Sequence, residues 1–106
     1  MRTPEFSKAV DSAKQKVKEG KYDEAIAMLE KADTKSPDVR RALAETHLAY
    51  ADSFFYNNSL PPRQKYRPAL KEYRRVLEYD KDNKKAKENI AMIESVYKSM
   101  GMPIPQ

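Results

Sequence analysis

The sequence predicts an all-α fold in which five helices pack as successive hairpins. Only two of the 106 residues are glycine, and the regularly spaced turn residues that an all-β fold would need are missing. Apolar side chains recur every three or four residues along most of the chain, which is the period of one helix face. One pattern of apolar and aromatic residues also occurs twice, beginning at Tyr22 and again at Tyr66.

The first two helices are predicted from local signals. The first begins at Thr3-Pro4-Glu5, where a hydroxyl cap precedes a proline and an acidic residue. Its apolar face continues to Val17, and Gly20 ends it. Because only about two residues connect the two helices, they are expected to lie antiparallel. The second helix carries an apolar face of Tyr22, Ala25, Ile26, Leu29 and Ala32.

The third helix is predicted to open at Ser36-Pro37-Asp38, which repeats the cap, proline and acid pattern. It is expected to end near Asn57-Asn58. Two registers fit its apolar pattern. One places His47 and Phe54 on the core face, and the other, shifted by one residue, places Phe55 there.

The last two helices are predicted from proline and cap positions. The paired prolines of Ser59–Arg63 interrupt the helical pattern. A fourth helix follows, and Pro68 is expected in its first turn, where a missing N–H removes no helical bond. Asp80 or Asp82 is expected to cap the fifth helix. Gly101 closes that helix. The residues after it are expected to fray, and the alternative is that Pro103-Ile104-Pro105 docks as polyproline II on another domain.

Composition excludes several classes of function. The chain has no cysteine, which excludes a disulfide framework, a thiolate zinc site and a cysteine nucleophile. Its single histidine, His47, excludes sites that need two imidazoles, so we expect no enzyme activity, no metal and no cofactor. No apolar run has the length of a membrane span, and the start lacks the apolar run of a signal peptide. A cytoplasmic location is expected, or export if a leader has been removed.

The segment around the second helix resembles the tetratricopeptide repeat family. The residues that fit the family's small, aromatic, alanine and proline pattern are Gly20, Tyr22, Ala25, Leu29, Ala32 and Pro37. The resemblance implies a single domain, 1–106, built as a right-handed α-solenoid of about two and a half repeats. Its parts would be repeat 1 (6–39), repeat 2 (40–83), a capping helix (84–100) and a tail (101–106). Repeat 2 is ten residues longer than the family's 34-residue unit, and the excess is expected around Asn57–Lys65.

The resemblance also implies a non-catalytic protein–protein interaction module. The first helix of each unit would line a concave groove that binds a peptide or partner segment with an acidic group. The groove positions implied are Val10, Lys14, Val17, Arg41, Glu45, Leu48, Lys85, Asn89 and Met92.

Two other functions stay open. Because about three repeats are usually needed for a stable stack, the chain could be a self-assembling, homo-oligomeric scaffold. The net charge is +5, and segment 63–75 carries six cations and only one acid, Glu72, so it could bind nucleic acid electrostatically. We expect Tyr66 and Tyr73 on the core face, away from those cations, which makes nucleic acid the weaker alternative.

Overall fold

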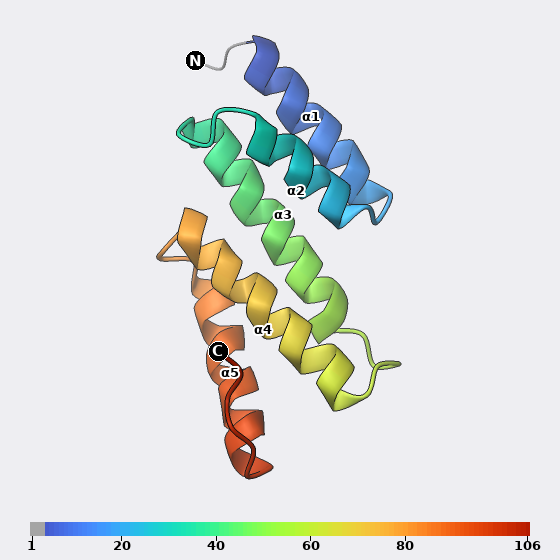
Figure 1. The fold of residues 1–106 in the computed structure, drawn as a ribbon, viewed down its shortest axis with the longest axis vertical. Coiled ribbons are helices and arrows are strands. Elements are labelled where there is room, and N and C mark those ends of the chain that lie inside the picture. The colour runs from blue at the N-terminus through green and yellow to red at the C-terminus, as the bar shows by residue number, and fades with distance from the viewer. Residues whose placement is uncertain (1–3) are drawn as a thin grey trace.

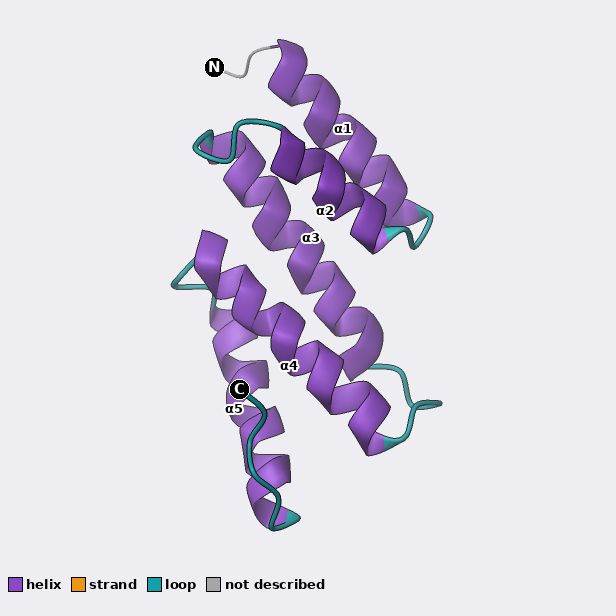
Figure 2. Cartoon of the chain, in the orientation of Figure 1, coloured by secondary structure: helices purple, strands orange, loops and turns teal. Residues whose placement is uncertain are grey.

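The computed structural model describes residues 4–106, so the expected cap at Thr3 lies outside the described residues. Within that range the chain forms five helices and no strand. Consecutive helices run antiparallel and stack into a body of 50 × 27 × 18 Å (Figure 1). Short loops connect them at alternating ends (Figure 2). The predicted all-α fold is confirmed. The helices are α1 (Pro4–Lys18), α2 (Tyr22–Lys31), α3 (Pro37–Phe55), α4 (Pro62–Tyr79) and α5 (Lys84–Ser99).

The core consists of two hydrophobic clusters that share α3. The first joins α1, α2 and α3 and has Leu29 and Leu43 fully buried. The second joins α3, α4 and α5 around Tyr73 and Ile93, which are also fully buried. The stacked hairpins therefore bury two apolar clusters that adjoin along α3, as neighbouring units do in repeat architectures.

Both registers predicted for the third helix are correct in part, because α3 packs on two sides. Val39 and Leu43, from the first register, face α1 and α2. Ala51 and Phe55 face α4 and α5. Phe54 is only half-buried, against Tyr50 at 5.1 Å between ring centroids.

The extra residues of the second hairpin lengthen its helices instead of forming a long loop. α3 has 19 residues and α4 has 18, whereas α1 has 15 and α2 has 10. Only residues 56–61 separate α3 from α4. The insertion was predicted to extend from Asn57 to Lys65, but α4 already begins at Pro62, so the prediction is wrong for residues 62–65. Pro62 suits the first helical position, and Tyr66 packs edge-on against Phe55 (6.2 Å between centroids), which stabilises the added turn.

Two further local predictions need correction. Pro68 lies inside α4 and not in its first turn. It therefore removes one helical donor, and the fully buried Ala69 and Leu70 hold the helix at that point. The cap of α5 is Asn83, not Asp80 or Asp82, because only the Asn83 side chain accepts the Ala86 N–H (3.0 Å).

The tail does not fray. Residues 102–106 turn back along α5 beside α4 (Figure 1). Met102 and Ile104 pack, half-buried, against the cluster of α3, α4 and α5. Arg74 Nη1 donates to the Pro105 carbonyl at 2.8 Å. These contacts replace water around two apolar side chains, which explains why the segment is held.

Candidate peptide-binding groove

Two hollows lie next to each other on the side of the stack formed by α1 and α3, and they meet at Glu45. The larger has a volume of about 640 Å³ and lies between α3 and the turn from α4 to α5. The smaller has a volume of about 240 Å³ and lies between α1 and α3. Residues lining the larger hollow are Pro37, Arg40, Arg41, Ala44, Glu45, Leu48, Tyr79, Asp80 and Asn83. Those lining the smaller are Val10, Ala13, Lys14, Val17, Lys18, Ala42, Glu45 and Thr46.

The smaller hollow has an apolar floor and a charged rim. Val10 and Ala13 are buried at 4% and 1% exposure, and Val17 is half-buried beside them. These residues share one face of α1 because they are three, four and seven positions apart. Lys14 and Lys18 are exposed at the edge. Such a surface suits an apolar side chain flanked by an acidic or polar group.

The larger hollow is more polar, and one of its walls is fixed. The Arg40 guanidinium donates to the carbonyls of Thr34 (3.4 Å) and Glu78 (3.1 Å). It also lies 5.4 Å from the centre of the Tyr79 ring, within cation–π range. Arg41, in contrast, is exposed, and its nearest acidic atom is 3.9 Å away on Asp38. Arg41 is therefore the cation of this hollow that is most available to a partner.

The structure brings six of the nine predicted groove residues together. Three from α1 and Glu45 line the smaller hollow, and Glu45 lines the larger one with Arg41 and Leu48. The three predicted residues of α5, which are Lys85, Asn89 and Met92, line neither of these hollows.

A polar network explains where two of those α5 residues lie. Tyr73 of α4 donates its hydroxyl hydrogen to Asp52 of α3 (2.6 Å) and accepts from the Asn89 amide (2.9 Å). Asn89 is 8% exposed and so belongs to the core. The Lys85 ammonium donates to the other Asp52 oxygen (2.8 Å), and this bond is the main cause that raises the pKa of Lys85. Met92, the third residue, is 56% exposed on the surface of α5.

Sequence reasoning missed the contribution of the turn between α4 and α5. Tyr79, Asp80 and Asn83 complete the larger hollow. The cap role of Asn83 is a detectable signal for the turn, but nothing local indicates that the turn lies against α3.

A buried contact between a histidine and a glutamate was also missed. His47 Nδ1 lies 2.7 Å from Glu72 Oε1, with His47 3% and Glu72 8% exposed. His47 Nε2 is buried and has no hydrogen-bond partner among the described residues. The pair joins α3 to α4 across 25 positions of sequence, so no local spacing could have revealed it.

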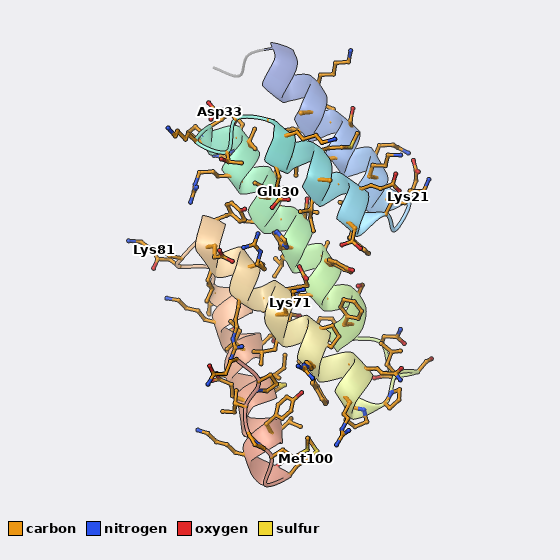
Figure 3. The ribbon with its side chains drawn as sticks, in the orientation of Figure 1. Lys21, Glu30, Asp33, Lys71, Lys81 and Met100 are labelled. Atoms are coloured by element: carbon orange, nitrogen blue, oxygen red, sulfur yellow. The ribbon has the colours of Figure 1, made fainter. Side chains whose placement is uncertain are left out.

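The basic segment 63–75 is not one uniform surface. Arg75 pairs with Glu78 (2.6 Å) and with Glu30 of α2 (3.4 Å), which Figure 3 labels. Tyr73 is fully buried and Tyr66 is half-buried. Binding of single-stranded nucleic acid requires an exposed aromatic ring on which a base can stack. The ring of Tyr73 is buried and cannot serve in this way.

Among the residues that the structure describes, no group of three or more His, Cys, Asp or Glu side chains could hold a metal ion. None of the five described helices combines the length and the apolar character that crossing a bilayer requires.

Antiparallel helical hairpins that stack through shared helix faces define the chain as an α-helical repeat protein. Residues 16–52 match the tetratricopeptide repeat family model. The match runs from the end of α1 through α2 to most of α3, and it confirms the resemblance in that part of the chain. Tetratricopeptide repeats generally mediate protein–protein interaction. No curated protein and no solved structure matches the chain.

Proposed function

We propose that this chain is a protein–protein interaction module that binds an extended or helical segment of a partner in the two adjoining hollows of α1 and α3. The observation that carries the proposal is the continuity of the hollows at Glu45, beside an apolar floor that includes Val10 and Val17. α1–α2 and α3–α4 would be the two repeats, 6–39 and 40–83, with α5 as the capping helix. Non-catalytic binding in the cytoplasm stays a prediction.

The chemistry of the lining indicates what the partner segment carries. An apolar side chain would fill the smaller hollow next to Val10. A carboxylate or another acceptor would meet Lys14 at its rim or Arg41 in the larger hollow. Glu45 lies between these cations, so it would favour a donor in the middle of the segment and oppose a run of consecutive acids.

The test is a selection from a displayed peptide library, followed by affinity measurements on variants. Selected peptides are expected to bind Val17→Asp and Leu48→Asp at least tenfold more weakly than the original protein. Met92→Asp is the matched control, since Met92 is apolar and exposed but lines neither hollow. Circular dichroism would verify that each variant is folded.

Two results would contradict the proposal. Peptides that bind the Val17 and Leu48 variants with undiminished affinity would show that the hollows are not the site. An equal loss in Met92→Asp would place the partner on α5 instead.

A further inference from the structure

The residues that follow α5 are turned back by a defined helix end. Gly101 has φ +68°, in the left-handed region. Its N–H donates to the Lys98 carbonyl and the Met102 N–H donates to the Tyr97 carbonyl, both at 3.0 Å. These two bonds form a Schellman motif. The direction of the tail is therefore set by the backbone at Gly101.

The tail lies on α4 and α5 as an extended peptide would lie in a groove. Met102 and Ile104 are half-buried, whereas Pro103 between them is exposed. This alternation is the pattern of an extended chain with one face against a surface. The Pro105 carbonyl receives the hydrogen bond from Arg74. Three half-buried side chains, those of Met102, Ile104 and Pro105, and one hydrogen bond to α4 hold the tail. Its exchange for another peptide would leave the fully buried core side chains in place.

A row of cations lies beside the tail. Arg63, Arg67 and Lys71 are exposed and follow one another at intervals of four residues, so they share one face of α4. Figure 3 labels Lys71 near the middle of this helix. Two hollows of about 500 and 510 Å³ lie between the row and the tail, and Arg67 and Gln106 line both of them.

The cations of this row are not neutralised within the described structure. The side chains of Arg63, Arg67 and Lys71 have no ion-pair or hydrogen-bond partner among residues 8–106. Arg74 differs, because Glu94 lies 3.8 Å from it. Like charges four residues apart on a helix repel each other. An acidic side chain beside Gln106 would relieve that repulsion, which the uncharged side chain of Gln106 does not do.

We infer that the face of α4 and α5 under residues 102–106 is a second peptide site. Its occupant would be a partner protein's extended segment in which apolar residues alternate with proline, as in the tail, and which continues into acidic residues. The tail fills the apolar part of the site, and the partner's carboxylates would reach Arg67 and Lys71. The residues lining this site do not overlap with those of the α1–α3 hollows, so the inference does not rest on the function proposed above.

The experiment uses the full chain and two labelled peptides. Both peptides repeat residues 102–106; one continues with three glutamates and the other with three serines. Fluorescence anisotropy would measure their binding to the original protein and to Met102→Ser/Ile104→Ser, which releases the tail without shortening the chain. The glutamate peptide is expected to bind the released variant at least tenfold more tightly than the original protein, and at least fivefold more tightly than the serine peptide binds.

Two additional variants test the charges. Arg67→Glu/Lys71→Glu, made in the released background, is expected to remove the preference for the glutamate peptide. Lys31→Glu/Lys35→Glu is the matched control, since it reverses two exposed cations that line none of these four hollows and should leave the affinity unchanged. Circular dichroism identifies any variant that is unfolded. If the released variant is unfolded, Arg74→Ala replaces it, since that change removes the bond to Pro105 and the ion pair with Glu94 but keeps Met102 and Ile104.

Each alternative result would overturn the inference. If the peptides do not bind, or bind the original protein and the released variant equally well, the tail is a fixed part of the fold. A labelled single-stranded oligonucleotide that binds where both peptides fail would assign the cation row to nucleic acid. Sedimentation that shows the original protein as a dimer and the released variant as a monomer would assign the site to the tail of a second copy.

Discussion

Tyr73→Phe would test whether the polar network at the centre of the second hairpin stabilises the stack. Tyr73 is fully buried. Its hydroxyl donates to Asp52 at 2.6 Å and accepts from Asn89 at 2.9 Å, so one oxygen joins α3, α4 and α5. Phenylalanine would fill the same space, so the change removes two hydrogen bonds without opening a cavity.

The expected loss follows from those two bonds. A hydrogen bond to a charged acceptor contributes about 1.5–3 kcal/mol to stability, and a neutral one contributes about 1 kcal/mol. The Asn89 amide would also lose its partner at 8% exposure. We expect Tyr73→Phe to lower the free energy of unfolding by about 3 kcal/mol. With an unfolding entropy of about 2.1 cal/mol/K per residue, this loss lowers the Tm by about 13 °C.

Urea unfolding followed by circular dichroism would measure the loss as a lower midpoint at an unchanged m value. Tyr97→Phe is the matched control. Tyr97 is also buried, at 4% exposure, but its hydroxyl forms no hydrogen bond with a described residue. That variant should change stability by less than about 0.5 kcal/mol. Equal effects of the two variants, or a loss below 0.5 kcal/mol for Tyr73→Phe, would refute the role of the network.

Three more predictions concern the same chain. Gly20→Ala should lower the free energy of unfolding, measured in urea, by about 1 kcal/mol. Gly20 has φ +77°, so an added Cβ would strain the backbone although it would touch no neighbouring atom. An unchanged free energy of unfolding would contradict the left-handed conformation of Gly20. His47→Ala should lower it by about 3 kcal/mol by leaving Glu72 buried without its partner, whereas Glu72→Gln, which can still accept from Nδ1, should lower it by less than about 1 kcal/mol. Burial, and then the bond to Asp52, raise the pKa of Tyr73. The folded state therefore keeps this proton at a pH where the unfolded state loses it, so stability should be complete below pH ~10 and fall above it. Tyr73→Phe should weaken that alkaline loss in a pH series of urea midpoints.

The first hairpin could be predicted from sequence because its signals are local. Gly20 ends α1 in the left-handed conformation, and the Lys21 N–H closes the helix on the Lys16 carbonyl at 2.8 Å. Ala25 and Leu29, chosen from their helical spacing, are both fully buried. Each of these features depends on residues fewer than ten positions apart.

The second hairpin was harder to predict because distant contacts decide between local choices. Pro62 and Pro68 are both suited to a first helical turn. The earlier start of α4 places Tyr66 against Phe55 of α3, a contact across the hairpin that spacing does not show. The tail is a similar case. A segment of five residues is too short for a periodic signal, and its position depends on Arg74 of another helix.

The candidate groove was predicted on α1 and α3 but not on α5, and the reason is again a long-range bond. Lys85 and Asn89 have the spacing of an exposed helix face. Asp52 and Tyr73, which come from two other helices, engage both side chains. Polar residues at expected groove positions can thus serve the core when a partner lies opposite them.

The two proposed sites lie on different helices of the stack, the first on α1 and α3 and the second on α4 and α5. Glu45 of α3 lies where the α1–α3 hollows meet, and the cation row lies on α4 beside the tail. Ligands at the two sites would not compete for a lining residue. Tyr79 is the structural link, since it packs against both hydrophobic clusters and also lines the larger hollow. Because close-packed interiors transmit displacements through such contacts, coupling between the sites should pass through Tyr79. The absence of coupling would leave the chain as an adaptor that holds two segments independently.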